Sequence, residues 1–73
     1  MTREEEYFLR ERIRQLREKA GLTQTDLAKQ MGVDASTVCH WERGSIQPAL
    51  NKVCKLADLF HVTVDYLLGR ETG

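Results

Sequence analysis

Two cysteines and two histidines are the residues of this chain whose side chains most often ligate metals or act as nucleophiles: Cys39, His40, Cys54 and His61. Cys39 and His40 are neighbours, so on a helix their side chains point about 100° apart. That spacing suits neither a metal pair nor a nucleophile–base pair, because both need converging side chains. The sequence also has no glycine-rich phosphate loop and no carboxylate pair within a supporting motif. We therefore predict no catalytic site, no metal site, no cofactor and no small-molecule ligand.

The stretch from Thr23 to Gly44, TQTDLAKQMGVDASTVCHWERG, predicts two short helices joined by a tight turn. Thr23 can cap the first helix, with Asp26 reaching back to it in a capping box. Gly32 stands where a helix commonly ends in a left-handed residue. The apolar face between these two ends has helical spacing and consists of Leu27, Ala28 and Met31.

The second helix of this pair is expected to begin after Asp34, a candidate N-cap, and to end before Gly44. Val38 and Trp41 carry its apolar face, and we expect the N–H of the buried Trp41 to find a partner. Two helices this short cannot lie flat in one bundle, so they are expected to cross at a steep angle. One face of the second helix is then left free.

A longer helix is predicted before this pair, from about Arg3 to Ala20, with a capping box formed by Thr2 and Glu5. Tyr7 and Phe8 lie on its first turns. They either fold back over the core as a lid, which we favour, or pack against a second copy of the chain. The inward face of this helix is expected to be Leu9, Ile13, Leu16 and Ala20.

A fourth helix is predicted from about Pro48 to Phe60, because the missing N–H of proline costs nothing at a first helical position. Leu59 is expected to point outward. Thr63 can cap a last short helix, Val64 to Leu68, and residues from Arg70 to Gly73 are expected to fray. The residues expected to face the core from the fourth helix are Leu50, Val53, Ala57 and Phe60, with Cys54 and Leu56 widening the stripe.

A length of 73 residues predicts a single domain, 1–73, with its core in 9–68, a helical N-terminal extension in 1–8 and a tail in 70–73. No apolar run approaches the about 20 residues that span a bilayer. Two cysteines without C-x-x-C spacing fit a reducing compartment, and we expect the cytoplasm. A domain of this size buries only about 60% of its unfolded surface, so it gains stability by pairing.

Three motifs and a proline occur in a fixed order: GLTQTDLAKQMGV, STVCHWERG, Pro48 and LADLFHVTVDYLL. Together they resemble the phage-repressor/Cro-like helix-turn-helix DNA-binding proteins, the Xre family. The resemblance covers roughly Ile13 to Leu68. It implies an all-α fold, a compact five-helix lambda-repressor-like domain whose helices 2 and 3 form the helix-turn-helix.

The resemblance further implies that the helix from about 35 to 43 enters the major groove of double-stranded DNA. Many relatives carry Arg or Gln on its reading face, where they form bidentate pairs with bases. Here the side chains are mostly short and only His40 reaches far, so DNA shape is a second possible source of specificity. The matching base-reading positions are Ala35, Ser36, Thr37, Cys39 and His40.

Other positions match residues that contact the DNA backbone in the family. Gln24 opens a helix whose N-terminus can meet a phosphate. Arg10 and Arg17 belong either to a solvated face or to phosphates that flank the site. Glu42 is expected to be structural, bonded to loop backbone or to a nearby arginine. The predicted phosphate contacts are Gln24, Arg43, Ser45 and Gln47, with Asn51 and Lys52 at the start of the next helix.

Eleven basic and eleven acidic residues give a net charge of zero, although phosphate binding depends on Lys and Arg. Binding must then rely on a local patch, on polar groups, or on a second copy. In the family that the chain resembles, two reading helices sit one DNA turn apart, about 34 Å. We predict a symmetric homodimer on an inverted-repeat operator, with an interface of Leu59, Val64, Tyr66, Leu67 and Leu68.

Two functions remain open from the sequence. The first is a small, sequence-specific transcriptional regulator, and a repressor in particular. The second is a protein-interaction module on the same fold, such as an antitoxin-like partner, with DNA binding secondary. Zero net charge and short reading side chains favour the module, whereas Gln24, Arg43 and the intact connection after Gly44 favour the regulator.

Overall fold

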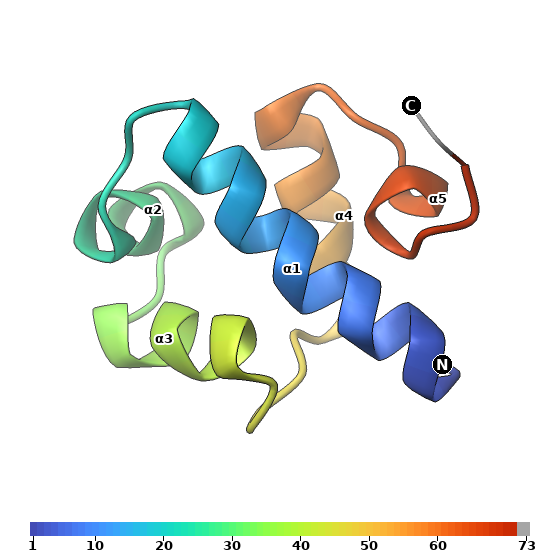
Figure 1. Ribbon diagram of the computed structural model, residues 1–73. Coiled ribbons are helices and arrows are strands. Elements are labelled where there is room, and N and C mark those ends of the chain that lie inside the picture. The colour runs from blue at the N-terminus through green and yellow to red at the C-terminus, as the bar shows by residue number, and fades with distance from the viewer. Residues whose placement is uncertain (72–73) are drawn as a thin grey trace.

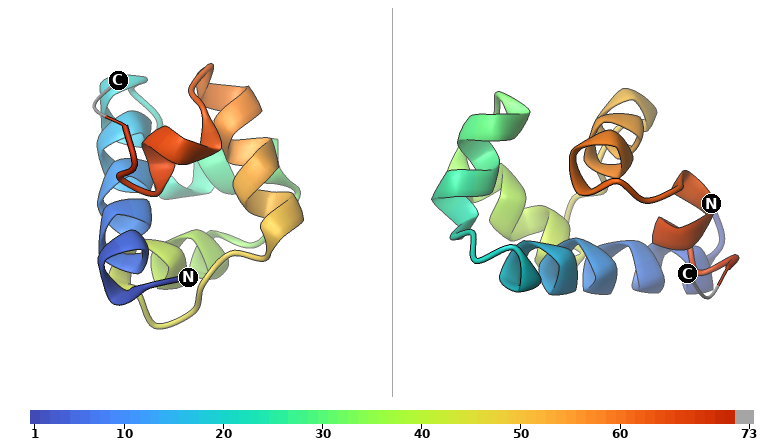
Figure 2. Two further views of the ribbon diagram at one scale, coloured as in Figure 1. Left: turned by 90° about the vertical axis from the view of Figure 1, so that its right-hand side faces the viewer. Right: turned by 90° about the horizontal axis from the view of Figure 1, so that it is seen from above.

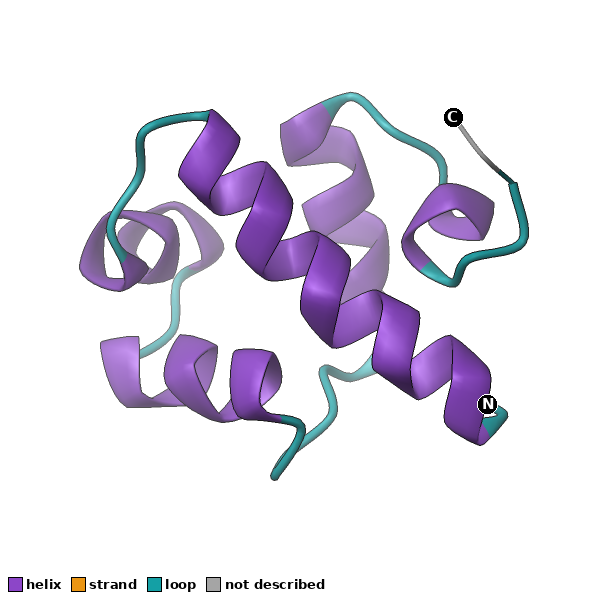
Figure 3. Cartoon of the chain, viewed as in Figure 1, coloured by secondary structure: helices purple, strands orange, loops and turns teal. Residues whose placement is uncertain are grey.

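The computed structural model describes residues 1–71, and this part of the chain forms five helices and no strand (Figures 1 and 3). The predicted all-α class is confirmed. α1 crosses the molecule diagonally, with α2 and α3 on one side of it and α4 and α5 on the other (Figures 1 and 2). The helices are α1 (Arg3–Lys19), α2 (Gln24–Met31), α3 (Ala35–Arg43), α4 (Leu50–Phe60) and α5 (Val64–Leu67).

Side-chain caps fix the starts of three helices where the sequence placed them. Thr2 and Thr23 each form a complete capping box, with Glu5 and Asp26 respectively. Thr63 accepts a hydrogen bond from the backbone N–H of Tyr66 and starts α5. Asp34 stands at the N-cap of α3, but its side chain makes no capping hydrogen bond there. Each satisfied cap pairs a backbone N–H that would otherwise lack a partner inside the helix.

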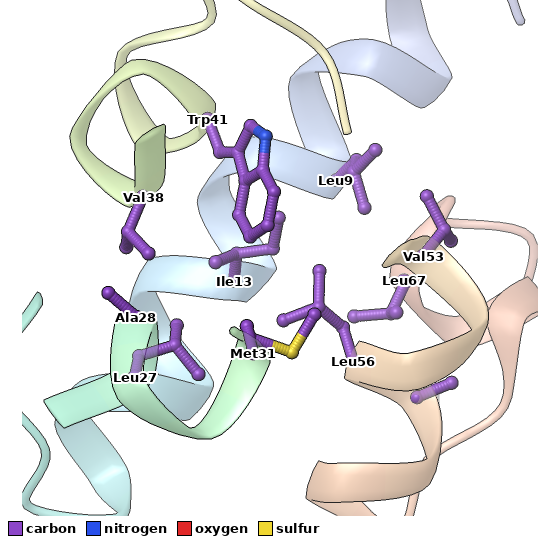
Figure 4. Close-up of a cluster of buried hydrophobic side chains, with 11 residues drawn as sticks. Leu9, Ile13, Leu27, Ala28, Met31, Val38, Trp41, Val53, Leu56 and Leu67 are labelled. Atoms are coloured by element: carbon purple, nitrogen blue, oxygen red, sulfur yellow. The ribbon is translucent and has the colours of Figure 1, made fainter. Parts of the chain in front are cut away.

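Every helix contributes side chains to one apolar core (Figure 4). Trp41 is 3% exposed, as predicted, but its N–H has no hydrogen bond within residues 1–71. Ala20, expected inside, is exposed at the end of α1. The buried apolar residues are Leu9, Ile13, Leu27, Ala28, Met31, Val38, Trp41, Val53, Leu56, Ala57 and Leu67.

The fourth helix differs from the prediction in its start and in its inner face. Pro48 is buried, Ala49 has an extended backbone as the N-cap, and α4 begins only at Leu50. Leu50 shares the inward spacing, but on the first turn of α4 it is 75% exposed. Leu56, placed at the edge of the stripe, is fully buried at its centre. Cys54, also expected at the edge, is exposed, and Leu59, expected outside, packs half-buried on the core.

The N-terminal extension packs against the C-terminal end of the chain. The Phe8 ring fills the space beside Gly69, where a Cβ would come within 2.3 Å of it. The Arg12 guanidinium lies 4.2 Å from the centre of the Tyr66 ring and donates to the carbonyl of Tyr66. Phe8 therefore packs on the C-terminal end of the chain and not on the core as the favoured lid would require, and Tyr7 stays 50% exposed.

The tail was expected to fray from Arg70 onward, but its first two residues, Arg70 and Glu71, contact α1. The Arg70 guanidinium lies 2.6 Å from the Glu5 carboxylate. The Glu71 carbonyl accepts a hydrogen bond from Arg12 at 3.2 Å. The last two residues of the predicted tail, 72–73, lie outside the described residues. Across residues 1–71, no helix has the length and apolar character that crossing a membrane requires.

Leu56 and Leu50 offer a matched test of the α4 inner face. Leu56→Ala removes a fully buried side chain and is expected to lower the free energy of unfolding by about 2 to 5 kcal/mol, through lost burial and the cavity left behind. Leu50→Ala alters an exposed side chain and should change it by less than about 0.5 kcal/mol. Urea unfolding followed by circular dichroism measures both. Equal losses in the two variants would contradict this assignment.

Candidate nucleic-acid interface

α3 lies at an outer edge of the molecule, with α1 and α2 on its inner side (Figure 1). Its inner face buries Val38, Trp41 and Glu42. In Figure 1, α2 is seen nearly along its axis while α3 lies across the view, so the two helices cross steeply as expected. The remaining face of α3 is open. Ser36 and Arg43 are exposed there, and Thr37, Cys39 and His40 are half-exposed between them.

Four of the five predicted base-reading residues share this open face. Ser36 and His40 stand four residues apart and Arg43 three further on, so they form one stripe along the helix. Ala35, the fifth, is partly buried and packs against the core. The open face as a whole offers two hydroxyl groups, one thiol, one imidazole and one guanidinium. It can donate and accept hydrogen bonds but holds no long amide side chain.

The turn before α3 sets the position of this face. Gly32 has φ 72°, a left-handed conformation that suits a residue without Cβ, and it ends α2. The next residue, Val33, donates its N–H to the carbonyl of Ala28 at 3.0 Å.

At the other end of α2, the backbone N–H of Thr23 donates a hydrogen bond to the Asp26 carboxylate, which lowers the pKa of Asp26 below its ordinary value. Both ends of α2 are thereby closed by local hydrogen bonds.

A buried ion pair joins α3 to α1. Arg17 Nε lies 2.7 Å from Glu42 Oε2, and Arg17 Nη2 donates to Glu42 Oε1 at 3.1 Å, which makes the pair bidentate. The two side chains are only 13% and 5% exposed. The hydrogen bonds that Arg17 donates to Glu42 raise the pKa of Arg17 above its ordinary value. Glu42 thus has the structural role predicted for it, through an arginine, and Arg17 is not free for a phosphate.

Three of the predicted phosphate contacts are engaged within the chain. The Gln24 amide donates to Glu42 Oε1 at 3.2 Å. Ser45 Oγ lies 2.7 Å from Nδ1 of His40. The Lys52 ammonium donates to the carbonyl of Met31 at 3.3 Å, at the C-terminal end of α2.

The other phosphate candidates, Arg43, Gln47 and Asn51, are exposed around the connection between α3 and α4. Arg10 joins them from α1, because its Nη1 lies 3.4 Å from the carbonyl of Arg43. Its guanidinium also lies 5.3 Å from the centre of the Tyr7 ring. The structure therefore brings two arginines, from α1 and α3, to the C-terminal end of α3.

The residues assigned to a dimer interface mostly serve the core of their own chain. Leu67 is 0% exposed, so it belongs to the core of its own chain and not to the predicted interface. Leu59, Val64 and Leu68 pack on the core and are half-buried. Tyr66 is also half-buried, beneath Arg12. The large apolar side chains that are exposed lie elsewhere: Met1, Tyr7, Ile46 and Leu50.

Two interactions of the site were not identified from the sequence. The arginine partner of Glu42 is 25 residues away, and no local pattern singles out Arg17 among the arginines of α1. The contact between His40 and Ser45 had a usable signal, because the left-handed Gly44 turns the next residue back along the last turn of α3. Within residues 1–71, no three His, Cys, Asp or Glu side chains cluster as a metal site would require.

The family model described as helix-turn-helix matches residues 13–67, which is most of the chain. The chain therefore belongs to the Xre-type helix-turn-helix family, and the resemblance read from its motifs is confirmed. Its structure is similar to that of the P22 c2 repressor protein, crystallised in complex with synthetic operator 9T. The TM-score is 0.79 and the identity 32%, over 86% of this chain and 96% of that one.

Transcriptional regulators are among its relatives in sequence. ImmR of Bacillus subtilis is 33% identical over 86% of this chain, which spans 50% of the length of ImmR. An HTH-type transcriptional regulator of Archaeoglobus fulgidus is 39% identical over 81% of this chain, and the match spans 84% of that protein. YobD of Bacillus subtilis is 42% identical over 81% of this chain, which spans 53% of YobD.

Removing Glu42 tests the ion pair that holds α3 in place. Glu42→Ala leaves Arg17 buried without its carboxylate, and we expect the free energy of unfolding to fall by about 3 to 5 kcal/mol. Glu11→Ala is the control, since the Glu11–Arg14 pair is of similar length, 2.8 Å, but more exposed. It should cost less than about 1 kcal/mol. Denaturant unfolding measures both, and a small loss for Glu42→Ala would contradict a structural role for the pair.

Proposed function

We propose that this chain is a sequence-specific DNA-binding transcriptional regulator that places α3 in the major groove. The observation that carries the proposal is the open polar stripe of α3, which lies opposite a fully packed inner face. A helix held by its inner face and free on its outer face suits insertion into a groove about 12 Å wide. The P22 c2 repressor, whose fold is similar, was crystallised with an operator.

The electrostatics of the site support DNA binding despite the zero net charge. Glu42 is the only acidic residue within α3, and Arg17 neutralises it inside the protein. Arg43 is exposed at the end of the same helix, and Arg10 lies beside it. Phosphates near this end would therefore meet two guanidinium groups without a facing carboxylate from α3. Gln47 and Asn51 extend the polar surface along the connection to α4.

The proposed regulator acts as a repressor in the cytoplasm, without catalysis. Occupying a promoter is sufficient for repression, and DNA binding by α3 requires no further activity. We also place it on DNA as a symmetric homodimer over an inverted repeat, because one short reading helix covers few base pairs. The exposed portions of Leu59, Val64, Tyr66 and Leu68 are the proposed contact surface, with Leu67 removed from the set.

A protein-interaction module is the second candidate, and the surface gives it one specific argument. Tyr7 and Ile46 are 50% and 52% exposed, and both line a hollow of about 220 Å³ between α1 and the α3–α4 connection. Exposed apolar side chains around a hollow are typical of protein contacts. At the same time Gln24 and Lys52, two of the phosphate candidates, are engaged within the chain.

Selection of bound sequences from random DNA tests the regulator directly. The wild-type protein should enrich an inverted repeat whose half-sites are one helical turn apart, and the affinity should fall with salt. The double variant Ser36→Ala, His40→Ala should lose the sequence preference while it remains folded. Cys54→Ser, on the exposed side of α4, serves as the control. Enrichment of the same repeat by the double variant would show that α3 does not read bases.

Val64 and Leu50 give a matched test of the dimer, because each is the first residue of its helix. Glu at a helix start is favourable, so Val64→Glu and Leu50→Glu should both fold. Sedimentation is expected to show a wild-type dimer at high micromolar concentration. Val64→Glu should weaken it about tenfold and Leu50→Glu should not. A wild-type monomer would contradict the homodimer. A dimer weakened by Leu50→Glu and unaffected by Val64→Glu would place the interface at Leu50 instead.

A further inference from the structure

His40 and Ser45 form a side-chain pair at the C-terminal end of the reading helix. His40 Nδ1 lies 2.7 Å from Ser45 Oγ, a short and strong hydrogen-bond distance. Gly44, with φ 81°, ends α3 and turns Ser45 back toward the last helical turn. The pair therefore joins His40, the longest of the predicted base-reading side chains, to the connection that follows α3.

The surrounding hydrogen bonds favour one position for the proton that lies between His40 and Ser45. The carbonyl of His40 already accepts from the backbone N–H of Gly44 at 3.0 Å, of Ser45 at 3.1 Å and of Ile46 at 3.4 Å. A carbonyl oxygen has two lone pairs, so these three donors already crowd it. The Ser45 hydroxyl lies 3.4 Å from this carbonyl, farther than the 2.7 Å that separate it from Nδ1. The hydroxyl proton is therefore better placed on Nδ1, so in neutral His40 the ring proton lies on Nε2.

This tautomer makes Nε2 a hydrogen-bond donor. When the imidazole is protonated, Nδ1–H donates to Ser45 Oγ and Nε2–H is again a donor, so both protonation states present the same group. Within residues 1–71, Nε2 has no hydrogen-bond partner. In the major groove a donor matches guanine best, because guanine offers two acceptors, N7 and O6, and no amino group there.

We propose that Ser45 is a positioning residue that fixes His40 as a donor to N7 or O6 of a guanine in each half-site. The inference rests on the proposed function and changes one part of it. Ser45 acts through the base-reading histidine and does not contact a phosphate with its hydroxyl. It also assigns a base to a reading face whose other side chains are short.

The free protein allows a first test that needs no DNA. The chain has two histidines, and His61 lies at the end of α4 with φ 57°, a conformation that asparagine tolerates. His61→Asn therefore leaves His40 as the only imidazole. Nitrogen-15 NMR of this variant should show a proton on Nε2 and a hydrogen-bonded lone pair on Nδ1. Adding Ser45→Ala should give a mixture of tautomers, and Ser45→Thr should restore the single form.

DNA binding gives the second test, on the sequence selected by the wild-type protein. Ser45→Ala should weaken binding to that sequence about threefold to tenfold, the range for loss of one hydrogen bond. Binding to unrelated DNA should stay unchanged. Replacing the contacted guanine by 7-deazaguanine or adenine should weaken the wild type by a similar factor. The same replacement should have little further effect on Ser45→Ala, and Ser45→Thr should behave as the wild type.

The outcomes separate this inference from the function on which it rests. A wild-type protein that selects no sequence would refute the proposed regulator and the base assignment together, while the NMR result would still decide the tautomer. Specific binding with equal losses on specific and unrelated DNA would make Ser45 a phosphate contact and overturn the inference alone. A mixed tautomer in the presence of Ser45 would also overturn it.

Discussion

The bidentate ion pair between Arg17 and Glu42 is the interaction on which the position of α3 depends. Arg17 also donates to the carbonyl of Leu22, and Glu42 accepts from Gln24, so one buried network ties α1, the start of α2 and α3 together. Burying a charge costs free energy unless an opposite charge and hydrogen bonds compensate for the lost water. Because this network forms only when the three helices meet in one arrangement, it favours a single position of α3 over alternatives that a generic apolar core would tolerate.

The network also shapes the electrostatics of the outer surface. By holding Glu42 inside, it removes the carboxylate of α3 from the side that would face DNA, and it leaves Arg43 exposed with Arg10 beside it. A protein of zero net charge can then present a locally cationic end to a phosphate backbone. Charge distribution, and not the total charge, is the quantity relevant to binding in a molecule this small.

A second set of contacts fixes the opposite end of the molecule. Phe8 packs on Gly69, and Arg12 lies between the rings of Phe8 and Tyr66 at 5.0 and 4.2 Å. α5 has only four residues and would not be stable alone. The first turns of α1 therefore supply the packing surface that this short helix needs, which gives the N-terminal extension a structural role beyond the family core of residues 13–67.

The sequence by itself determined the five helices, most of their ends and the family, because capping boxes, stop glycines and helical spacing act over a few residues. It also placed the open face of α3, since Val38 and Trp41 mark the opposite side. It could not show that Leu50 is exposed and Leu67 buried, because both depend on which helix covers a given turn. The pairing of Arg17 with Glu42 depended on tertiary structure for the same reason: the two residues are 25 positions apart, and only the packing of α1 on α3 brings them within reach of each other.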